Sequence, residues 1–117
     1  ATDVPAGRPH PWMCLQNAFN LEIYPLEAIV KVGDTLPDIS EGLNAGMWTI
    51  GLAVTGNEFG RTEAEIAAMD PDDYEACRDR AYGRMAQTGA HYVVDSIADV
   101  SPLLDQINAR LAGGERP

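Results

Sequence analysis

Lys31-Val32-Gly33-Asp34-Thr35-Leu36-Pro37-Asp38 joins an apolar segment to the start of an expected helix. The residues from Ile29 to Val32 have the pattern of a buried strand, and two carboxylates, Asp34 and Asp38, follow it. Open α/β sheets bind ligands at the carboxyl ends of their strands, and carboxylate oxygens are ligands that Mg2+ prefers. This stretch therefore indicates phosphate or phosphonate chemistry at a metal.

Strands and helices are expected to alternate along the rest of the chain. The first helix should begin near Pro9 and Pro11 and end before Pro25. We expect it to bury one face, which carries Trp12, Leu15, Ala18 and Phe19. The other expected elements are strands over 29–32, 49–54 and 91–94 and helices over 35–45, 62–69, 70–88 and 101–112.

This alternation predicts an α/β fold, with a parallel sheet flanked by helices in a partial Rossmann-like arrangement. Three strands make a thin sheet, and an uncovered edge of a parallel sheet is a liability. We therefore expect residues 1–117 to be one part of a larger domain, with strands missing on one side.

The composition limits the class of partner. The chain has 117 residues and a formal net charge of -10, from 18 acidic and 8 basic residues. This charge disfavours nucleic acid and anionic membrane surfaces as partners, and solubility explains it. No run of about 18 apolar residues suggests a membrane span, and no signal peptide opens the sequence. Cys14 and Cys77 are expected to be small buried residues, which fits a cytoplasmic location.

The two carboxylates and one arginine are the candidate site residues. Asp34 and Asp38 are four residues apart, so they can face the same side, where Mg2+ would relieve their repulsion. Asp38 has an alternative interpretation as a first-turn acid that the helix dipole favours. Arg8 lies in the stiff segment Gly7-Arg8-Pro9-His10-Pro11, and its guanidinium suits a phosphoryl group. Its alternative interpretation is a surface arginine in a leader segment.

Several other residues have an ordinary structural explanation. His10 and His91 lack a Cys or His partner at metal-ligand spacing, and Met47 and Trp48 fit packing at a strand entry. Lys31, the only lysine, is expected to extend from a covered face toward solvent. Asn57 and Glu58 follow the second strand, where a role in lining the site remains open.

Taken together, the motifs resemble a known family. Gly7-Arg8-Pro9-His10-Pro11 followed by Gly33-Asp34 and Asp38 resembles the third and fourth motifs of the haloacid dehalogenase superfamily. Six stretches make the chain similar to the phosphonoacetaldehyde hydrolase family, the phosphonatase branch of that superfamily. They are Val4 to Pro9, Pro11 to Met13, Val30 to Thr35, Glu41 to Thr49, Thr55-Gly56-Asn57-Glu58 and Gly89 to Tyr92.

This resemblance implies a reaction and a set of roles. In the family, a cap-domain lysine forms a Schiff base with phosphonoacetaldehyde, a core aspartate attacks phosphorus, and water hydrolyses the aspartyl-phosphate. Arg8 would neutralise and bind the phosphonate, and Asp34 would ligate Mg2+. Asp38 would act in catalysis by supporting the metal site through its waters or a hydrogen bond, and Thr35 would bind substrate. The complete enzyme would be a cytoplasmic homodimer that releases acetaldehyde and phosphate.

The sequence also departs from the family pattern. No Asp-x-Asp or Asp-x-Ala motif follows a first strand, and no cap segment offers a Schiff-base lysine. We therefore expect residues 1–117 to be the carboxyl-terminal portion of the core domain, inactive alone. Two alternatives stay open: another capped phosphatase or phosphomutase of the superfamily, and a non-catalytic flavodoxin-like binding module.

Overall fold

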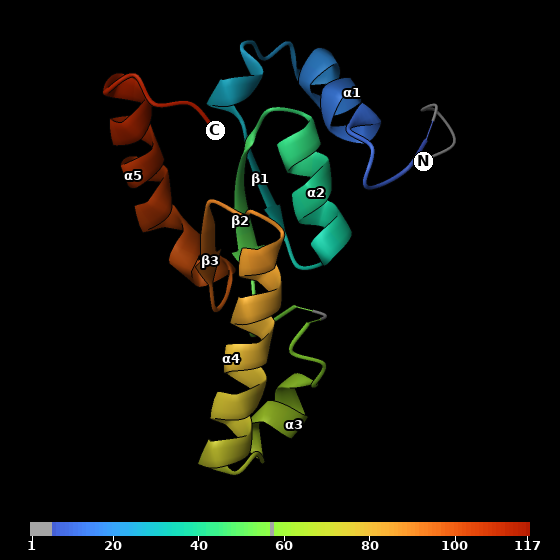
Figure 1. Ribbon diagram of the computed structural model, residues 1–117, viewed down its shortest axis with the longest axis vertical. Coiled ribbons are helices and arrows are strands. Elements are labelled where there is room, and N and C mark those ends of the chain that lie inside the picture. Colours follow the sequence, from blue (N-terminus) through green and yellow to red (C-terminus); the bar gives the residue numbers. More distant parts are fainter. Residues whose placement is uncertain (1–5, 57) are drawn as a thin grey trace.

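Three short parallel strands lie at the centre of the molecule (Figure 1). The computed structural model describes residues 6–56 and 58–117. Its strands are β1 (Val30–Gly33), β2 (Trp48–Leu52) and β3 (Tyr92–Val94), in the order β1-β2-β3. Val30 lies opposite Trp48 in the parallel register of β1 and β2. The predicted α/β class with a parallel sheet is confirmed.

Helices cover both faces of this sheet (Figure 1). The crossover α2 connects β1 to β2, and α3 and α4 connect β2 to β3, so both parallel connections are helical as this geometry requires. The helices are α1 (Trp12–Leu21), α2 (Leu36–Asn44), α3 (Glu63–Ala67), α4 (Pro71–Gln87) and α5 (Val100–Ala112), with short 3-10 turns at Leu26–Ala28 and Ile97–Asp99.

The alternation of side chains along β2 explains this layering. Trp48 and Ile50 are fully buried and pack in one cluster with Ile107 of α5. Between them, Thr49 faces α2, where a Cβ added to Gly42 would approach the Thr49 methyl to 2.8 Å. The sheet is therefore a middle layer, with α5 on one face and α2 and α4 on the other.

The capping residues behave largely as the sequence predicts. Thr35 and Thr62 each form a capping box at the start of α2 and α3. Gly46 and Gly89 follow α2 and α4 with φ of +79° and +90°, where a side chain would strain the backbone. The structure corrects some bounds: β1 begins at Val30 and includes Gly33, and α5 begins one residue before Ser101.

The expected second strand is also corrected at both ends. The sequence predicts this strand over residues 49–54, whereas β2 begins at Trp48 and ends at Leu52. The backbone N–H groups of Ala53 and Val54 still donate to the carbonyls of Val94 and Asp95. The chain there continues beside β3 as it turns into the loop.

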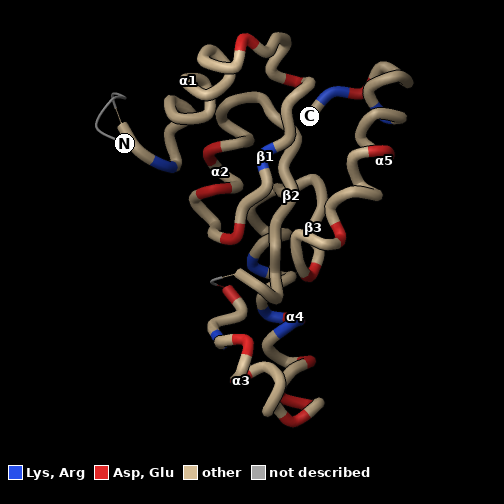
Figure 2. The backbone as a smooth tube through the Cα atoms, turned by 180° about the vertical axis from the view of Figure 1, so that it is seen from behind, with Lys and Arg blue, Asp and Glu red and all other residues tan. Residues whose placement is uncertain are grey.

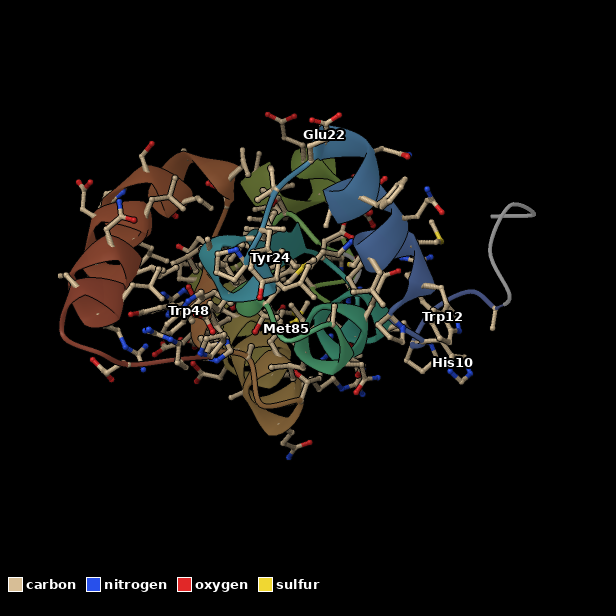
Figure 3. The ribbon with its side chains drawn as sticks, turned by 90° about the horizontal axis from the view of Figure 1, so that it is seen from above. His10, Trp12, Glu22, Tyr24, Trp48 and Met85 are labelled. Atoms are coloured by element: carbon tan, nitrogen blue, oxygen red, sulfur yellow. The ribbon has the colours of Figure 1, made fainter. Side chains whose placement is uncertain are left out.

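The apolar face predicted for α1 is wrong in part. Trp12 is 41% exposed and Phe19 is 79% exposed, whereas Cys14 and Ala18 are buried. The helix packs along the line of Cys14 and Ala18 against Ala45 and Met47, so only a narrow stripe is covered. Figure 3 shows Trp12 on the outer side of the molecule, away from Trp48 at its centre.

Both cysteines are buried and free, as expected. Burial, followed by the charge of Glu41, raises the pKa of the Cys14 thiol to about 11, which keeps it protonated at neutral pH. Across residues 6–56 and 58–117, the helices lack the length and hydropathy that a membrane span needs.

Candidate functional site

The candidate site lies where β1 ends and α2 begins. Asp34 follows Gly33, the last residue of β1, and Thr35 is the N-cap of α2. The loop after β2 passes close by, because a Cβ added to Gly56 would lie 2.8 Å from the Asp34 Cβ and 2.9 Å from the Asp34 carbonyl. Gly56 is therefore needed for this close approach of the loop to Asp34.

Asp38 has two roles in the structure. Its backbone N–H donates to Thr35 Oγ1 at 3.2 Å, and its carboxylate accepts from the Thr35 backbone N–H at 3.3 Å. Arg8 Nη1 donates to the other carboxylate oxygen of Asp38. The first-turn interpretation of Asp38 is thus confirmed, and the same side chain also holds the candidate phosphate-binding arginine.

These contacts set the charge state of the pair. Burial alone would raise the pKa of the Asp38 carboxyl, but the hydrogen bonds from Arg8 and Thr35 outweigh it. The nearby charge of Lys31 acts in the same direction, so the pKa lies below its usual value. The hydrogen bond to Asp38 raises the pKa of Arg8. Both groups are ionised at neutral pH.

Glycine at position 33 allows Asp38 to approach β1. A Cβ on Gly33 would overlap the Cβ of Asp38 and lie 3.1 Å from its carboxyl carbon. Asp38 is 8% exposed, because the end of β1 covers it. The Gly33-Asp34 sequence therefore does more than end the strand: its glycine makes room for the second carboxylate.

The segment around Arg8 is also held by Asn44, a contact that the sequence analysis did not identify. Asn44 Nδ2, at the end of α2, donates to the Pro9 carbonyl at 2.8 Å. Arg8 and Pro9 are thus attached to opposite ends of the same helix. Asn44 belongs to the stretch that carried the family resemblance, which was the only sequence signal for this contact.

A second ion pair, between Lys31 and Glu41, lines the same pocket as the first and was also not predicted. Lys31 Nζ lies 3.0 Å from Glu41 Oε1, and Glu41 is 1% exposed. Lys31 therefore does not extend freely toward solvent, whereas the sequence predicted that it would. Arg8, Lys31, Asp38 and Glu41 all line one open pocket of about 450 Å3. Figure 2 shows the corresponding acidic positions along α2, with basic positions before α1 and in β1.

The other predicted residues lie apart from this cluster. His10 points outward near the start of α1 (Figure 3). His91 Nδ1 accepts from the Thr49 backbone N–H at 3.0 Å at the opposite, amino end of the strands. Glu58 pairs with Arg84 of α4 at 3.2 Å. Asn57 and the Val4-Pro5 part of the family motif lie outside the described residues.

The described residues supply part of a donor set for Mg2+. Asp34 follows the strand directly and, in the part of the chain that the structure describes, no hydrogen bond or ion pair occupies its carboxylate. Within the same residues, His, Cys, Asp and Glu side chains form no group of three that could hold a metal. One free carboxylate fits Mg2+, because this ion keeps several waters and takes one or two protein carboxylates. The remaining ligands would come from outside these residues.

A parallel sheet with helices on both faces and a carboxylate directly after its first strand is the α/β architecture that the resemblance to the haloacid dehalogenase superfamily predicts. A solved structure supports this fold assignment. The phosphonoacetaldehyde hydrolase-like protein of Oleispira antarctica matches with a TM-score of 0.96 at 46% identity. The match covers 100% of this chain and 42% of that one.

Curated relatives are similar to this chain over its whole length. A phosphonoacetaldehyde hydrolase-like protein of Syntrophobacter fumaroxidans is 58% identical, and a phosphonoacetaldehyde hydrolase of Nitratidesulfovibrio vulgaris is 51% identical. Each match covers 100% of this chain and 42% of the relative. No family model matches the chain. The chain is thus homologous over its whole length to part of the phosphonoacetaldehyde hydrolases, and spans about two fifths of their length.

Proposed function

We propose that this chain forms the carboxyl-terminal part of the core of a phosphonoacetaldehyde hydrolase. The complete protein, meaning a polypeptide of the length of the relatives of which this chain spans about two fifths, would cleave the carbon–phosphorus bond to give acetaldehyde and phosphate. The observation that carries the proposal is the identity of 51–58% to the relatives over the whole chain. The contact between Arg8 and Asp38 supports it, because it joins the two motifs that the resemblance rests on.

Arg8 is proposed to bind the phosphonate. Its guanidinium presents a planar set of donors, of which one is used by Asp38, and its side chain is 46% exposed toward the pocket and solvent. Asp38 holds this guanidinium in place and balances its charge. Asp38 therefore supports catalysis through Arg8.

Thr35 is proposed as a second substrate contact. Its Oγ1 already accepts the N–H of Asp38, so the hydroxyl proton is what it can offer to a phosphonate oxygen. It also lies beside Asp34 at the beginning of α2, where backbone N–H groups favour negative charge.

Asp34 is proposed as the ligand that this chain supplies to Mg2+. When bound, the ion would neutralise charge on the transferring phosphoryl group. The loop at Gly56 lies close to the Cβ and the carbonyl of Asp34, which fixes the point from which the carboxylate extends. The nucleophilic aspartate, the Schiff-base lysine and the rest of the metal site are proposed to belong to the part of the complete protein outside these 117 residues.

The partners and location follow the same proposal. The substrate is a small phosphonate, and the net charge of -10 argues against nucleic acid and membrane surfaces as partners. The complete enzyme is proposed to be a cytoplasmic homodimer.

The test is release of acetaldehyde from phosphonoacetaldehyde by the complete protein with Mg2+. We expect release that is strongly reduced in Arg8→Ala and Asp34→Asn. The matched controls are Arg80→Ala and Asp105→Asn, which remove the same charges at exposed helix positions. Turnover of an ordinary phosphate ester without acetaldehyde release would leave a superfamily phosphatase and refute the phosphonate assignment. Retained activity in Asp34→Asn would refute the metal role.

A further inference from the structure

The buried Lys31–Glu41 pair calls for an explanation beyond stability. Glu41 is 1% exposed, and its second carboxylate oxygen, Oε2, is buried with no hydrogen-bond partner among the described residues. Burial removes the hydration of a carboxylate, and an oxygen without a hydrogen-bond partner does not recover that free energy. The desolvation cost therefore offsets much of the stabilisation that the ion pair provides. An apolar pair of the same size would fill this space with less penalty.

The position of the pair suggests what it does instead. Glu41 lies three residues after Asp38, on the same face of α2, so the two carboxylates are neighbours on the helix. Lys31 lies on β1 beneath them, and a Cβ on Gly42 would approach its Cβ to 2.8 Å. The helix backbone thus confines the lysine stem, and its ammonium group has carboxylates within reach on α2.

Asp38 is the carboxylate that a free Lys31 would compete for. Lys31 is already close enough for its charge to lower the pKa of the Asp38 carboxyl. An ammonium group is a compact charge on a flexible stem, so it can rotate toward whichever acceptor is available. Glu41, at 3.0 Å, is the acceptor that it takes in the structure.

We propose that Glu41 is a positioning residue that holds Lys31 away from Asp38, and thereby leaves Asp38 to fix the guanidinium of Arg8. One pocket then holds two separate ion pairs, Arg8 with Asp38 and Lys31 with Glu41. This inference rests on the proposed role of Arg8 in binding the phosphonate, and it assigns no direct contact with substrate to Lys31 or Glu41.

Two variants distinguish this positioning role from a purely structural one, which would predict equal losses of activity in both. Glu41→Gln and Lys31→Met both break the same ion pair and both lower stability. In Glu41→Gln the lysine is released and pairs with Asp38, which displaces Arg8. In Lys31→Met no second cation is left to compete with Arg8 for Asp38, so we expect the contact between Arg8 and Asp38 to remain. The double variant Lys31→Met/Glu41→Gln should behave like Lys31→Met.

The experiment uses the complete protein with Mg2+ and measures kcat/KM for phosphonoacetaldehyde well below the unfolding temperature of each variant. We expect kcat/KM to fall on the order of tenfold or more in Glu41→Gln, because a charge-assisted contact is displaced. In Lys31→Met and in the double variant, kcat/KM should stay within about threefold of the starting protein. Glu27→Gln, which removes a surface carboxylate paired with Arg116, is the control and should change little. Equal losses in Glu41→Gln and Lys31→Met would overturn the proposal.

Crystal structures of the same variants provide a readout that does not depend on turnover. In Glu41→Gln we expect Lys31 Nζ within hydrogen-bond distance of the Asp38 carboxylate and Arg8 displaced from it. An unchanged contact between Arg8 and Asp38 in that variant would refute the positioning role. If the unaltered complete protein releases no acetaldehyde, the proposed function fails, and these structures alone decide whether Glu41 restrains Lys31.

Discussion

Arg8, in the segment before α1, donates a hydrogen bond to Asp38, which lies thirty residues later in the first turn of α2. The contact brings together two sequence motifs that are separated by a helix and a strand. Because the same carboxylate also closes the capping box of α2, the position of Arg8 is fixed by the start of that helix. The arginine is therefore held by a rigid element, although it lies in a loop.

Replacement of Arg8 should reveal how much its planar geometry matters. In the complete protein, Arg8→Ala is expected to lower kcat/KM roughly a hundredfold or more, because a donor to the phosphoryl group is lost. Arg8→Lys keeps the charge but cannot contact Asp38 and a phosphonate oxygen in the same way, so an intermediate loss is expected. Steady-state kinetics with phosphonoacetaldehyde measure both. Full activity of Arg8→Lys would show that charge alone suffices.

Removal of the Asn44 side chain should loosen the Arg8 segment without touching the ion pair. Asn44 Nδ2 donates to the Pro9 carbonyl at 2.8 Å, so Asn44→Ala removes one of two attachments of this segment to α2. We expect kcat/KM to fall about threefold to tenfold, in line with the loss of one neutral hydrogen bond. Asn108→Ala, on the exposed side of α5, is the matched control. An unaffected Asn44→Ala would mean that Asp38 alone orders the segment.

Much of this architecture was predictable from sequence. The capping signal of Thr35 and the glycine at position 46 placed α2 closely, because such local chemistry acts within a few residues. The predicted burial of Phe19 on α1 is wrong, because the burial of this side chain depends on which other element packs against that side of the helix. The pair Lys31–Glu41 was missed for the same reason: two residues on different elements meet only through the packing of α2 on β1. Long-range pairing leaves no local pattern in a single sequence.

Gly56→Ala should weaken the metal site that we propose at Asp34. The added Cβ would lie 2.8 Å from the Asp34 Cβ and would overlap the Leu52 carbonyl, so the loop or the aspartate must shift. We expect Mg2+ affinity of the complete protein, measured by titration of activity, to fall on the order of tenfold. Gly83→Ala is the control: no atom lies within 4 Å of its added Cβ, and α4 should gain about 0.5–1 kcal/mol. Unchanged Mg2+ dependence in Gly56→Ala would contradict the expectation that the added Cβ displaces Asp34, and would mean that the loop moves instead.

His91 should make stability depend on pH near neutrality. Its Nδ1 accepts from the Thr49 backbone N–H, so the ring is neutral in the fold, and burial together with the charge of Arg110 lowers its pKa. Because the folded pKa lies below the unfolded value of about 6.5, the unfolded state takes up the proton first, and stability falls as pH drops below that value.

Chemical denaturation between about pH 7.5 and pH 5 measures this effect. The free energy of unfolding should fall with acidification, and His91→Asn should lose that component of the fall. His10→Asn, at the other histidine of this chain, should retain it, since His10 is exposed. An identical pH dependence in His91→Asn and the starting protein would contradict the prediction.

The 117-residue chain alone is expected to show no turnover of phosphonoacetaldehyde. Its sequence lacks the nucleophile motif after a first strand, and its only lysine is paired with the buried Glu41. In the described residues β1 pairs only with β2, and Leu21, which lines a pocket with Val30 and Lys31, is 68% exposed. An open strand edge beside an exposed apolar side chain is a surface where another polypeptide can pair.

A complementation experiment checks this. The purified chain is assayed alone and then after co-expression with the portion of the Syntrophobacter fumaroxidans relative that this chain does not match, which makes up the rest of that protein. We expect acetaldehyde release only from the co-expressed pair, and its loss when this chain carries Arg8→Ala, because the two parts contribute different groups to one site. A measurable rate from the rigorously pure chain would show instead that these residues hold a complete catalytic centre.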